Sequence, residues 1–354
     1  MVQKYYNHKD YNSLKFGHPL EKIRSGWYSD KYFIRTKEIF SFSNRHPIVI
    51  MQIFTKKRGI FCGGIESARV IRECSDDGKS LIIKGLGEGE KFRPWETVMN
   101  IEGDYQKFAH LETVYLGILA RYSSIATNVR KVVSAASGKP VLFFSARFDH
   151  YLVQEIDGYS AFVGGVSGVS TDANGFIFNK EGTGTIPHGL IAAFDGNTEK
   201  ASVAFDKYVS EDVKRIALVD FDNNCVETSL KVARKLKKKL FAVRLDTAEN
   251  IVDFSLQKKG ISKEGVCEEL VWEVRKALDK EGFDYVKIVI SGGFTPTKIR
   301  RFIKSNVPFD IVGVGSYFYR NRIDFTADIV MVDGRPIAKV GRKYNPNPRL
   351  KEIE

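Results

Sequence analysis

The chain has 354 residues, of which 43% are hydrophobic and 28% are charged, with 30 glycines and 10 prolines. This composition is typical of globular proteins and excludes a collagenous or largely disordered chain. The length predicts about two domains, because one domain takes about 150 residues. No apolar run approaches the ~20 residues that span a bilayer, and the start, MVQKYYNHKDYN, has no hydrophobic signal core. We therefore expect a cytoplasmic enzyme or binding protein with no membrane partner.

The charge balance is strongly basic. Lys and Arg number 55 against 43 Asp and Glu, which gives a formal net charge of +12. Such a surface attracts anions: nucleic acid, acidic lipid or a polyphosphorylated small molecule. The four cysteines are far apart and form no CxxC pair, so neither a zinc site nor a disulfide framework is indicated. They are Cys62, Cys74, Cys225 and Cys267.

The first part of the chain, residues 40–105, is expected to form short strands separated by Gly, Asp-Gly and Pro turns. The strand segments are FSF, HPIVIMQIF, RGIFCGG, SLIIKGLG and ETVMNIEG. GLGEGE at 85–90 resembles a dinucleotide fingerprint, but Pro94 and the lack of a following helical pattern favour a hairpin turn. LETVYLGILARY, at 111–122, has one apolar face and predicts a helix.

From about residue 140, apolar strand segments alternate with amphipathic helices, which is typical of βα units. The strands are VLFFS, RIALVD, LFAVRL, VKIVIS and DIVGVG. Helices are predicted over 225–239 and over 262–281, the latter with Ser262 as N-cap, and a third starts at Thr295 with Pro296 in its first turn. The basic face of KVARKLKKKL lacks interleaved aromatics and favours a solvated surface over nucleic-acid binding.

These patterns predict an α/β protein: an irregular βα barrel with a β-rich α/β N-terminal domain. Residues 1–128 are expected to form the N-terminal domain and 129–324 the catalytic barrel. The tail, 325–354, is expected to pack on the first domain, with GRKYNPNPRLKEIE as a solvated basic end. Residues 158–175 are dense in Gly, Ser and Ala, which permits close packing or close approach to a ligand.

Polar or glycine residues follow each apolar strand segment. They are Arg147, Asp220, Arg244, Asp246, Ser291-Gly292-Gly293 and Gly313-Val314-Gly315-Ser316. In a βα barrel the loops after the strands form the active-site face, and the last two commonly bind phosphate through backbone N–H groups. The predicted phosphate-binding residues are therefore Ser291, Gly292, Gly293, Gly313, Gly315 and Ser316; the alternative is two ordinary βα turns.

His188, in GTGTIPHGLIA, is a candidate catalytic residue because small neighbours leave room for a ligand; the alternative is a structural or surface histidine. Asp220 and Asp246 are candidates to hold Mg²⁺ or to accept hydrogen bonds from sugar hydroxyls, and either could instead cap a helix. Arg147 could pair with a ligand carboxylate or phosphate, or form an ion pair at the barrel rim.

An ordered series of motifs resembles the nicotinate phosphoribosyltransferase family, particularly its archaeal form, over nearly the whole chain. The motifs are RSGWYSDKYFIRT, PIVIMQIF, GIESARVI, IEGDYQKFAHLETVYLGILARYSSIAT, FSARFDH, GGVSGVST, GTGTIPHGLI, VRLDT, VISGGF and VGVGS. The resemblance implies an α/β domain on an incomplete βα barrel. It also implies a reaction of NAD biosynthesis, in which nicotinate and phosphoribosyl pyrophosphate give nicotinate mononucleotide and pyrophosphate.

The resemblance further implies Mg²⁺ as cofactor, ATP as co-substrate through a phosphorylated His188, and a homodimer or higher oligomer with a shared site. Tyr32 matches the tyrosine that stacks on the pyridine ring in a neighbouring subunit, and Phe144 matches the residue on the ring's other face. Arg147 matches the arginine near the pyridine carboxylate. Asp220, Arg244 and Asp246 match residues of the ribose and pyrophosphate region. The two glycine turns match the 5′-phosphate site.

Some positions depart from the family pattern. Phe148 stands where a second Arg often follows Arg147, and Thr247-Ala248-Glu249 replaces a usual Ser-Gly-Asp. Quinolinate enzymes carry an Arg directly after the Glu of the long helix, where this chain has Thr113. Nicotinamide enzymes carry an Asp after a Gly-Thr pair, and residues 182–185 have none. The alternatives are a quinolinate or nicotinamide phosphoribosyltransferase or, in another class, a basic nucleic-acid-binding protein.

Overall fold

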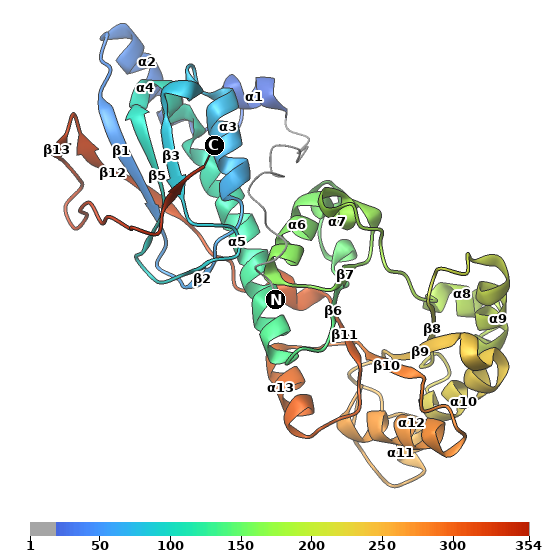
Figure 1. The fold of residues 1–354 in the computed structure, drawn as a ribbon. Coiled ribbons are helices and arrows are strands. Elements are labelled where there is room, and N and C mark those ends of the chain that lie inside the picture. Colours follow the sequence, from blue (N-terminus) through green and yellow to red (C-terminus); the bar gives the residue numbers. More distant parts are fainter. Residues whose placement is uncertain (1–18, 354) are drawn as a thin grey trace. The chain divides into compact units, whose positions relative to one another are not determined.

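The computed structural model describes residues 19–353, and the chain forms two compact units (Figure 1). Unit 1 comprises residues 1–130, 159–165 and 319–354, and unit 2 comprises residues 131–158 and 166–318. The fold class is confirmed: unit 1 is built on an antiparallel sheet with helices, and unit 2 on an open parallel sheet with helices, an incomplete βα barrel.

The sheet of unit 1 has six strands in the order β13-β12-β1-β5-β3-β14, every neighbouring pair antiparallel. The strands are β1 (Ile48–Phe54), β3 (Ile82–Gly85), β5 (Thr97–Asp104), β12 (Thr326–Val332), β13 (Arg335–Pro336) and β14 (Lys351–Glu352). β12 therefore brings the C-terminal part of the chain against β1, with Ala327 opposite Ile53. A separate ladder joins β2 (Gly59–Ile60) to β4 (Lys91–Phe92).

Helices pack on this sheet and close the core of unit 1. They are α1 (Leu20–Arg24), α2 (Lys31–Phe42), α3 (Gly64–Cys74), α4 (Tyr105–Phe108), the 3-10 turns η3 (Gly78–Ser80) and η4 (Ala109–Leu111), and α5 (Glu112–Ala135). The core consists of apolar side chains from strands and helices that are removed from water, among them Ile53, Ile71, Ile83, Ile101, Phe108, Tyr115 and Leu119. Burial of this area is the main stabilising term of the unit.

Several predictions for the first part of the chain are wrong. FSF is not a strand but the last turn of α2. The sequence gives no clear signal for α3, because the segment directly before it, RGIFCGG, has a strand-like pattern. GLGEGE is not a hairpin turn, since β3 pairs with β5 and β14 while β4 pairs with β2. Its Glu88 instead accepts hydrogen bonds from the backbone N–H groups of Gly63, Gly64 and Ile65, at 3.0, 2.7 and 3.2 Å, and so caps α3.

The basic tail is also more than a solvated end. Arg342 donates to Asp328 at 2.7 Å, and Arg349 pairs with Glu90 and Glu96 at 3.1 and 2.7 Å. The tail side chains therefore fasten the last strands of unit 1 to its earlier loops.

The sheet of unit 2 has six parallel strands in the order β7-β6-β11-β10-β9-β8, so β7 and β8 form its two edges (Figure 1). They are β6 (Val141–Phe143), β7 (Gly168–Val169), β8 (Arg215–Leu218), β9 (Leu240–Leu245), β10 (Lys287–Ile290) and β11 (Ile311–Val314). The five predicted strand segments are confirmed. β7 was missed because the Gly- and Ser-rich segment around it has little β-propensity.

The α-helices of unit 2 are α7 (Asp172–Gly175), α8 (His188–Ala193), α9 (Thr198–Tyr208), α10 (Cys225–Leu236), α11 (Phe254–Gln257), α12 (Glu268–Lys280) and α13 (Pro296–Lys304). α6 (Gln154–Gly164) begins in this unit. Short 3-10 turns are η5 (Ala146–Phe148), η6 (Tyr151–Val153), η7 (Phe176–Phe178), η8 (Lys237–Lys239) and η9 (Ser316–Tyr319).

The helix starting at Thr295 is confirmed, since the Thr295 hydroxyl accepts from the Lys298 N–H and Pro296 occupies the first turn. The prediction of Ser262 as N-cap is wrong: α12 begins six residues later, after Cys267, because Glu264 instead pairs with Val252 in an isolated bridge. None of the helices within residues 19–353 is long and apolar enough to cross a membrane.

Candidate active site

His188 and Asp220 form a close pair in unit 2. His188 opens α8 behind Pro187, and Asp220 lies just beyond the end of β8. The His188 Nε2 atom lies 3.2 and 3.1 Å from the two Asp220 carboxylate oxygens. A carboxylate only accepts hydrogen bonds, so Nε2–H is the donor, and Nδ1 is the ring nitrogen that Asp220 leaves free.

The two side chains of this pair differ in exposure. The His188 side chain is 48% exposed and that of Asp220 only 7%. The imidazole therefore faces solvent, and the carboxylate that binds it is buried. Burial raises the pKa of Asp220, the interaction with His188 lowers it, and the Asp246 charge raises it again. This is the arrangement of a histidine whose orientation and tautomer are set by a buried acid.

Arg244 is the centre of a second polar network, near the end of β9. Its Nε donates to Ser291 Oγ at 3.0 Å, its Nη1 to Thr185 Oγ1 at 2.7 Å and its Nη2 to Asp246 Oδ2 at 2.9 Å. Ser291 Oγ in turn donates to Asp246 Oδ1 at 2.7 Å. The guanidinium group lies over the Phe144 ring, 5.3 Å from its centroid. These four hydrogen bonds orient the side chains of the network before any ligand arrives.

These groups meet at one cavity of about 560 Å³. Its wall includes five of the predicted site residues, namely Phe144, Arg147, His188, Arg244 and Asp246, together with Ala146, Ser170, Thr183, Gly184, Thr185, Pro187, Gly189 and Leu218. The structure therefore brings candidates from the ends of β6 and β9 and from the start of α8 to one place, as expected for the carboxyl edge of a parallel sheet.

Thr185 was not predicted as a site residue. It lies in the GTGT segment, where the glycines suggested room for a ligand but the hydroxyl was overlooked. The sequence signal for Thr185 is its position three residues before His188, in the same loop. Both residues line the cavity. The bond of Thr185 to Arg244 links the loop that carries His188 to β9.

Arg147 and the second glycine turn are organised around two aromatic rings. Arg147, in η5, is exposed, and its guanidinium lies 5.5 Å from the Phe148 ring centroid. A Cβ on Gly313 would come within 2.5 Å of the Phe144 ring, and one on Gly315 within 2.5 Å of Phe148. These glycines are therefore required to seat the rings, whatever else their backbone binds. Ser316 starts η9 and is exposed.

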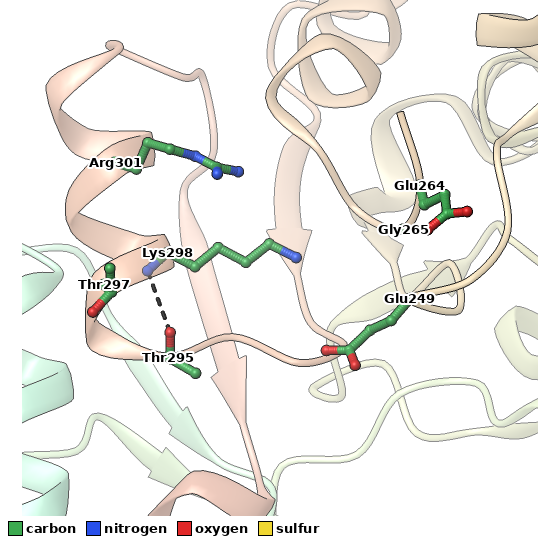
Figure 2. Close-up of a pocket in the computed structure, with 7 residues that line it drawn as sticks. All are labelled: Glu249, Glu264, Gly265, Thr295, Thr297, Lys298 and Arg301. Carbon is green, nitrogen blue, oxygen red and sulfur yellow. Dashed lines mark hydrogen bonds between the residues drawn. The ribbon is translucent and has the colours of Figure 1, made fainter. Parts of the chain in front are cut away.

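The first glycine turn precedes α13. Gly292 and Gly293 have φ angles of +84° and +62°, which favour glycine. The Glu249 carboxylate lies against Gly293: a Cβ there would be 1.4 Å from Glu249 Oε1. Figure 2 shows the adjoining cavity of about 410 Å³, with Lys298 reaching into it from α13 toward Glu249. Burial lowers the pKa of Lys298, while the Glu249 charge raises it.

Tyr32 belongs to unit 1. It lies in the first turn of α2 and is 59% exposed, with its hydroxyl 3.4 Å from Asp30 Oδ2. Asp30 also accepts from the Thr113 hydroxyl at 2.9 Å and donates its backbone N–H to Thr113 at 3.1 Å. Thr113, the residue that departs from the quinolinate pattern, thus serves to fix the start of α2.

The predicted magnesium ligands are two carboxylates, Asp220 and Asp246. Within residues 19–353 no group of three or more His, Cys, Asp or Glu side chains is arranged to hold a metal ion. Asp220 and Asp246 are close enough to influence each other's charge, but each already has a partner in His188 or Arg244.

Comparison with known proteins shows which proteins this chain resembles. Residues 30–123 match the family model described as Quinolinate phosphoribosyl transferase, N-terminal domain. Nicotinate phosphoribosyltransferase pncB1 of Mycobacterium tuberculosis is 27% identical over 265 residues, 73% of this chain and 55% of that protein. The crystal structure of nicotinate-nucleotide pyrophosphorylase from Pyrococcus furiosus is 34% identical, covers 94% of this chain and 81% of that one, and has a TM-score of 0.81.

The chain belongs to the phosphoribosyltransferase family that includes the nicotinate-nucleotide pyrophosphorylase of Pyrococcus furiosus and, at lower identity, the nicotinate phosphoribosyltransferases. It spans about half the length of the curated relatives that it matches. The human nicotinic acid phosphoribosyltransferase structure, with 15% identity over 88% of this chain and 76% of that one and a TM-score of 0.64, shares the fold. So does NadC from Streptococcus pyogenes, with 18% identity, a coverage of 88% and 97%, and a TM-score of 0.60.

Proposed function

We propose that this member of the family transfers the phosphoribosyl group of phosphoribosyl pyrophosphate to nicotinate, giving nicotinate mononucleotide and pyrophosphate. The observation that carries the proposal is the His188–Asp220 pair beside a cavity that also holds Phe144, Arg147 and Arg244. An imidazole held by a buried acid, an aromatic face and two guanidinium groups together suit a flat, anionic ring and a phosphorylated sugar.

Nicotinate would bind between the aromatic and basic side chains. The Phe144 ring offers a stacking face, and the exposed Arg147 guanidinium offers a planar fork for the carboxylate. An amide would leave the Arg147 charge without a counter-ion, so the acid is favoured over nicotinamide. The face of the pyridine ring opposite Phe144 would be covered by Tyr32 of a second subunit, in at least a dimer.

In the transfer step, the pyridine nitrogen forms a bond to C1′ of the ribose as the bond from C1′ to the pyrophosphate oxygen breaks. The electron pair of that bond leaves with pyrophosphate, while positive charge develops on the sugar. Asp220 and Asp246 would hold the ribose side, and Arg244 would stabilise the leaving anion through hydrogen bonds already oriented by Ser291 and Thr185.

Magnesium fits this site in part. Two carboxylates with mutual repulsion, Asp220 and Asp246, are what a hard cation prefers, and Mg²⁺ commonly takes only one or two carboxylates, completing its shell with water and substrate phosphates. When bound, it would neutralise charge on the pyrophosphate. The 5′-phosphate would be held by the two glycine turns, from Ser291 to Gly293 and from Gly313 to Ser316.

We further propose that ATP hydrolysis is coupled through His188. Asp220 accepts from Nε2–H, so Nδ1 is the nucleophile. Its lone pair would attack the γ-phosphorus, forming an N–P bond as the P–O bond to ADP breaks. Water later cleaves the N–P bond to give inorganic phosphate and the free imidazole. Half of the His188 side chain is exposed, which gives a phosphoryl donor access.

The direct test is a turnover assay with the purified chain. Nicotinate, nicotinamide and quinolinate are each supplied with phosphoribosyl pyrophosphate, with and without ATP. The proposal predicts product from nicotinate, faster with ATP. Product from quinolinate alone, with release of carbon dioxide, would assign the chain to the quinolinate reaction instead.

A further inference from the structure

Most of the surplus positive charge of the chain belongs to unit 1, whereas the cavity of the proposed active site is lined by residues of unit 2. By sequence, unit 1 holds 29 Lys and Arg against 19 Asp and Glu, whereas unit 2 holds 26 against 24. Ten of the twelve net charges therefore belong to unit 1. Attraction of substrate to the unit 2 cavity does not explain why the positive charge is concentrated in unit 1.

Part of this charge converges on one cavity of unit 1. The cavity has a volume of about 560 Å³ and is lined by Arg58, Lys91, Phe92, Arg93, Pro94 and Arg349. The short β2–β4 ladder brings these residues together, because Gly59 pairs with Phe92 and Ile60 with Lys91. The same register places Arg58 next to Arg93 at the end of the ladder. Like charges at adjacent cross-strand positions repel each other and are unfavourable without a counter-ion.

The neighbouring carboxylates do not neutralise this group. Glu90 and Glu96 flank β4 in sequence, but both are bound to Arg349, at 3.1 and 2.7 Å. Within residues 19–353, the side chains of Arg58, Lys91 and Arg93 make no ion pair within 4 Å and no hydrogen bond. All three are exposed at the cavity. Three cations without partners are thus arranged around one concave surface, which we call the β4 basic cavity.

The residue that follows the cavity-lining Pro94 in sequence has a second unusual feature. Trp95 follows Pro94 directly and is half exposed, with a φ of +67° that bulky side chains rarely adopt. Its ring stacks on Phe54, with centroids 5.7 Å apart, and Lys56 lies 5.6 Å from the ring centroid. Trp95 lies between the cavity-lining Pro94 and the start of β5, so its indole is the tryptophan chosen to follow binding at the cavity.

We propose that the β4 basic cavity binds an anion carrying several linked phosphate groups, at a site separate from the proposed active site. Arg58 and Arg93 supply planar forks that bind phosphate oxygens in pairs, and Lys91 adds a point charge. A single phosphate carries at most about two negative charges near neutral pH, whereas a chain of linked phosphates carries enough charge to neutralise all three cations. The recognised chemistry is the phosphate chain itself, whether from a nucleoside triphosphate or from inorganic polyphosphate.

The test is a fluorescence titration of the full-length protein with inorganic tripolyphosphate and, separately, with ATP. The chain has three tryptophans, so a change of emission that disappears in Trp95→Phe comes from the cavity. We expect such a change with tripolyphosphate. Equal affinity for ATP assigns recognition to phosphates alone, and tighter binding of ATP adds a contact to the nucleoside; both support the site.

The decisive variant is Arg58→Ala/Arg93→Ala. Its matched control is Lys79→Ala/Lys84→Ala, which removes the same two charges from exposed positions of unit 1 outside the cavity. We expect the first variant to bind tripolyphosphate at least about tenfold more weakly, the loss of two charge-assisted contacts, and the control to match the wild type. Circular dichroism and a thermal melt establish that both variants are folded.

Three results would overturn the proposal. Equal weakening in both variants would show a general attraction to net charge. A Trp95 response to single-stranded RNA but not to tripolyphosphate would make the cavity a nucleic-acid contact. A loss of kcat/KM for phosphoribosyl pyrophosphate in Arg58→Ala/Arg93→Ala that equals the loss of binding would show that these residues serve the active site. The binding readout does not depend on turnover, so it stands even where the proposed function fails.

Discussion

The imidazole of His188 and the carboxylate of Asp220 are joined through Nε2, at 3.1 and 3.2 Å, with the acid buried and the histidine half exposed. Thirty-two residues of sequence separate them, and the carboxyl edge of the parallel sheet brings them together. This pairing leaves Nδ1 as the basic nitrogen, and that assignment leads to the first two predictions.

Removing the imidazole should separate the two reactions. In His188→Ala we expect ATP hydrolysis coupled to turnover to be lost, while slow phosphoribosyl transfer without ATP remains, because Phe144, Arg147 and Arg244 are untouched. The measurement is the ratio of ADP to nicotinate mononucleotide formed. An unchanged ratio would contradict the role of His188.

Replacing the acid should act through the histidine. In Asp220→Asn the carboxylate that accepts from Nε2–H is replaced by an amide, which can present either its oxygen or its NH2 group. The orientation and the tautomer of the His188 ring are then less well fixed. We expect the ATP-coupled rate to fall by about 10- to 100-fold, the usual effect of losing a supporting partner. Phosphohistidine formation, followed with γ-labelled ATP, checks this. Asp222→Asn serves as a control on the same loop, since Asp222 binds Thr228 instead.

The glycine at position 313 should be needed for the site as well as for the fold. A Cβ there meets the Phe144 ring at 2.5 Å, so Gly313→Ala should displace the ring and destabilise the protein by about 1–3 kcal/mol. The KM for nicotinate should rise. Gly117→Ala, in α5, is the control, because no atom lies within 4 Å of its added Cβ; it should be neutral or slightly stabilising. Equal effects of the two changes would argue against ring displacement.

Site residues could be predicted from the sequence where neighbouring residues mark them, and not where a contact joins residues far apart in the chain. Strand ends mark Asp220, Arg244 and Ser291 directly, because polar residues interrupt apolar runs there. The bond between Arg244 and Thr185 joins residues 59 positions apart and appears only once the sheet is assembled. Glu88 was invisible for the same reason, since it caps a helix that begins more than twenty residues earlier.

The fold shows a similar division. The parallel strands of unit 2 are continuous apolar segments and were predicted, whereas α2 and α3 carry mixed patterns that tertiary packing decides. The short β7 strand lacks side chains that signal a strand and is held by its pairing with β6.

Two carboxyl groups of unit 1 predict a pH dependence of stability. Burial raises the pKa of Glu66 and of Glu112 to about 8, with nearby acidic groups adding to the rise. A folded-state pKa above the unfolded value means that each group stabilises the fold fully below its unfolded pKa of about 4.5, and that this stability is lost as the pH rises through about 8.

We therefore expect the free energy of unfolding to fall between about pH 5 and 9, and Glu112→Gln to reduce this fall by roughly 1–3 kcal/mol. Chemical denaturation at several pH values measures it. The exposed Glu38→Gln is the control and should follow the wild-type curve. A Glu112→Gln curve parallel to the wild type would contradict the assignment.

A shared active site predicts complementation between subunits. Tyr32→Ala and Arg147→Ala chains should each be nearly inactive alone, because one removes the ring from unit 1 and the other the carboxylate fork from unit 2. Mixed and reassembled, they should regain activity, since some sites then receive both intact groups. Activity that stays at the level of the separate variants would place Tyr32 and Arg147 outside a common site.

The position of nicotinate mononucleotide in a crystal of this protein is the decisive test of the proposed active site. We expect the pyridine ring against Phe144, its carboxylate on Arg147 and the ribose beside the His188–Asp220 pair. A mononucleotide bound elsewhere, with the cavity lined by Phe144, His188 and Arg244 vacant, would contradict the proposed active site.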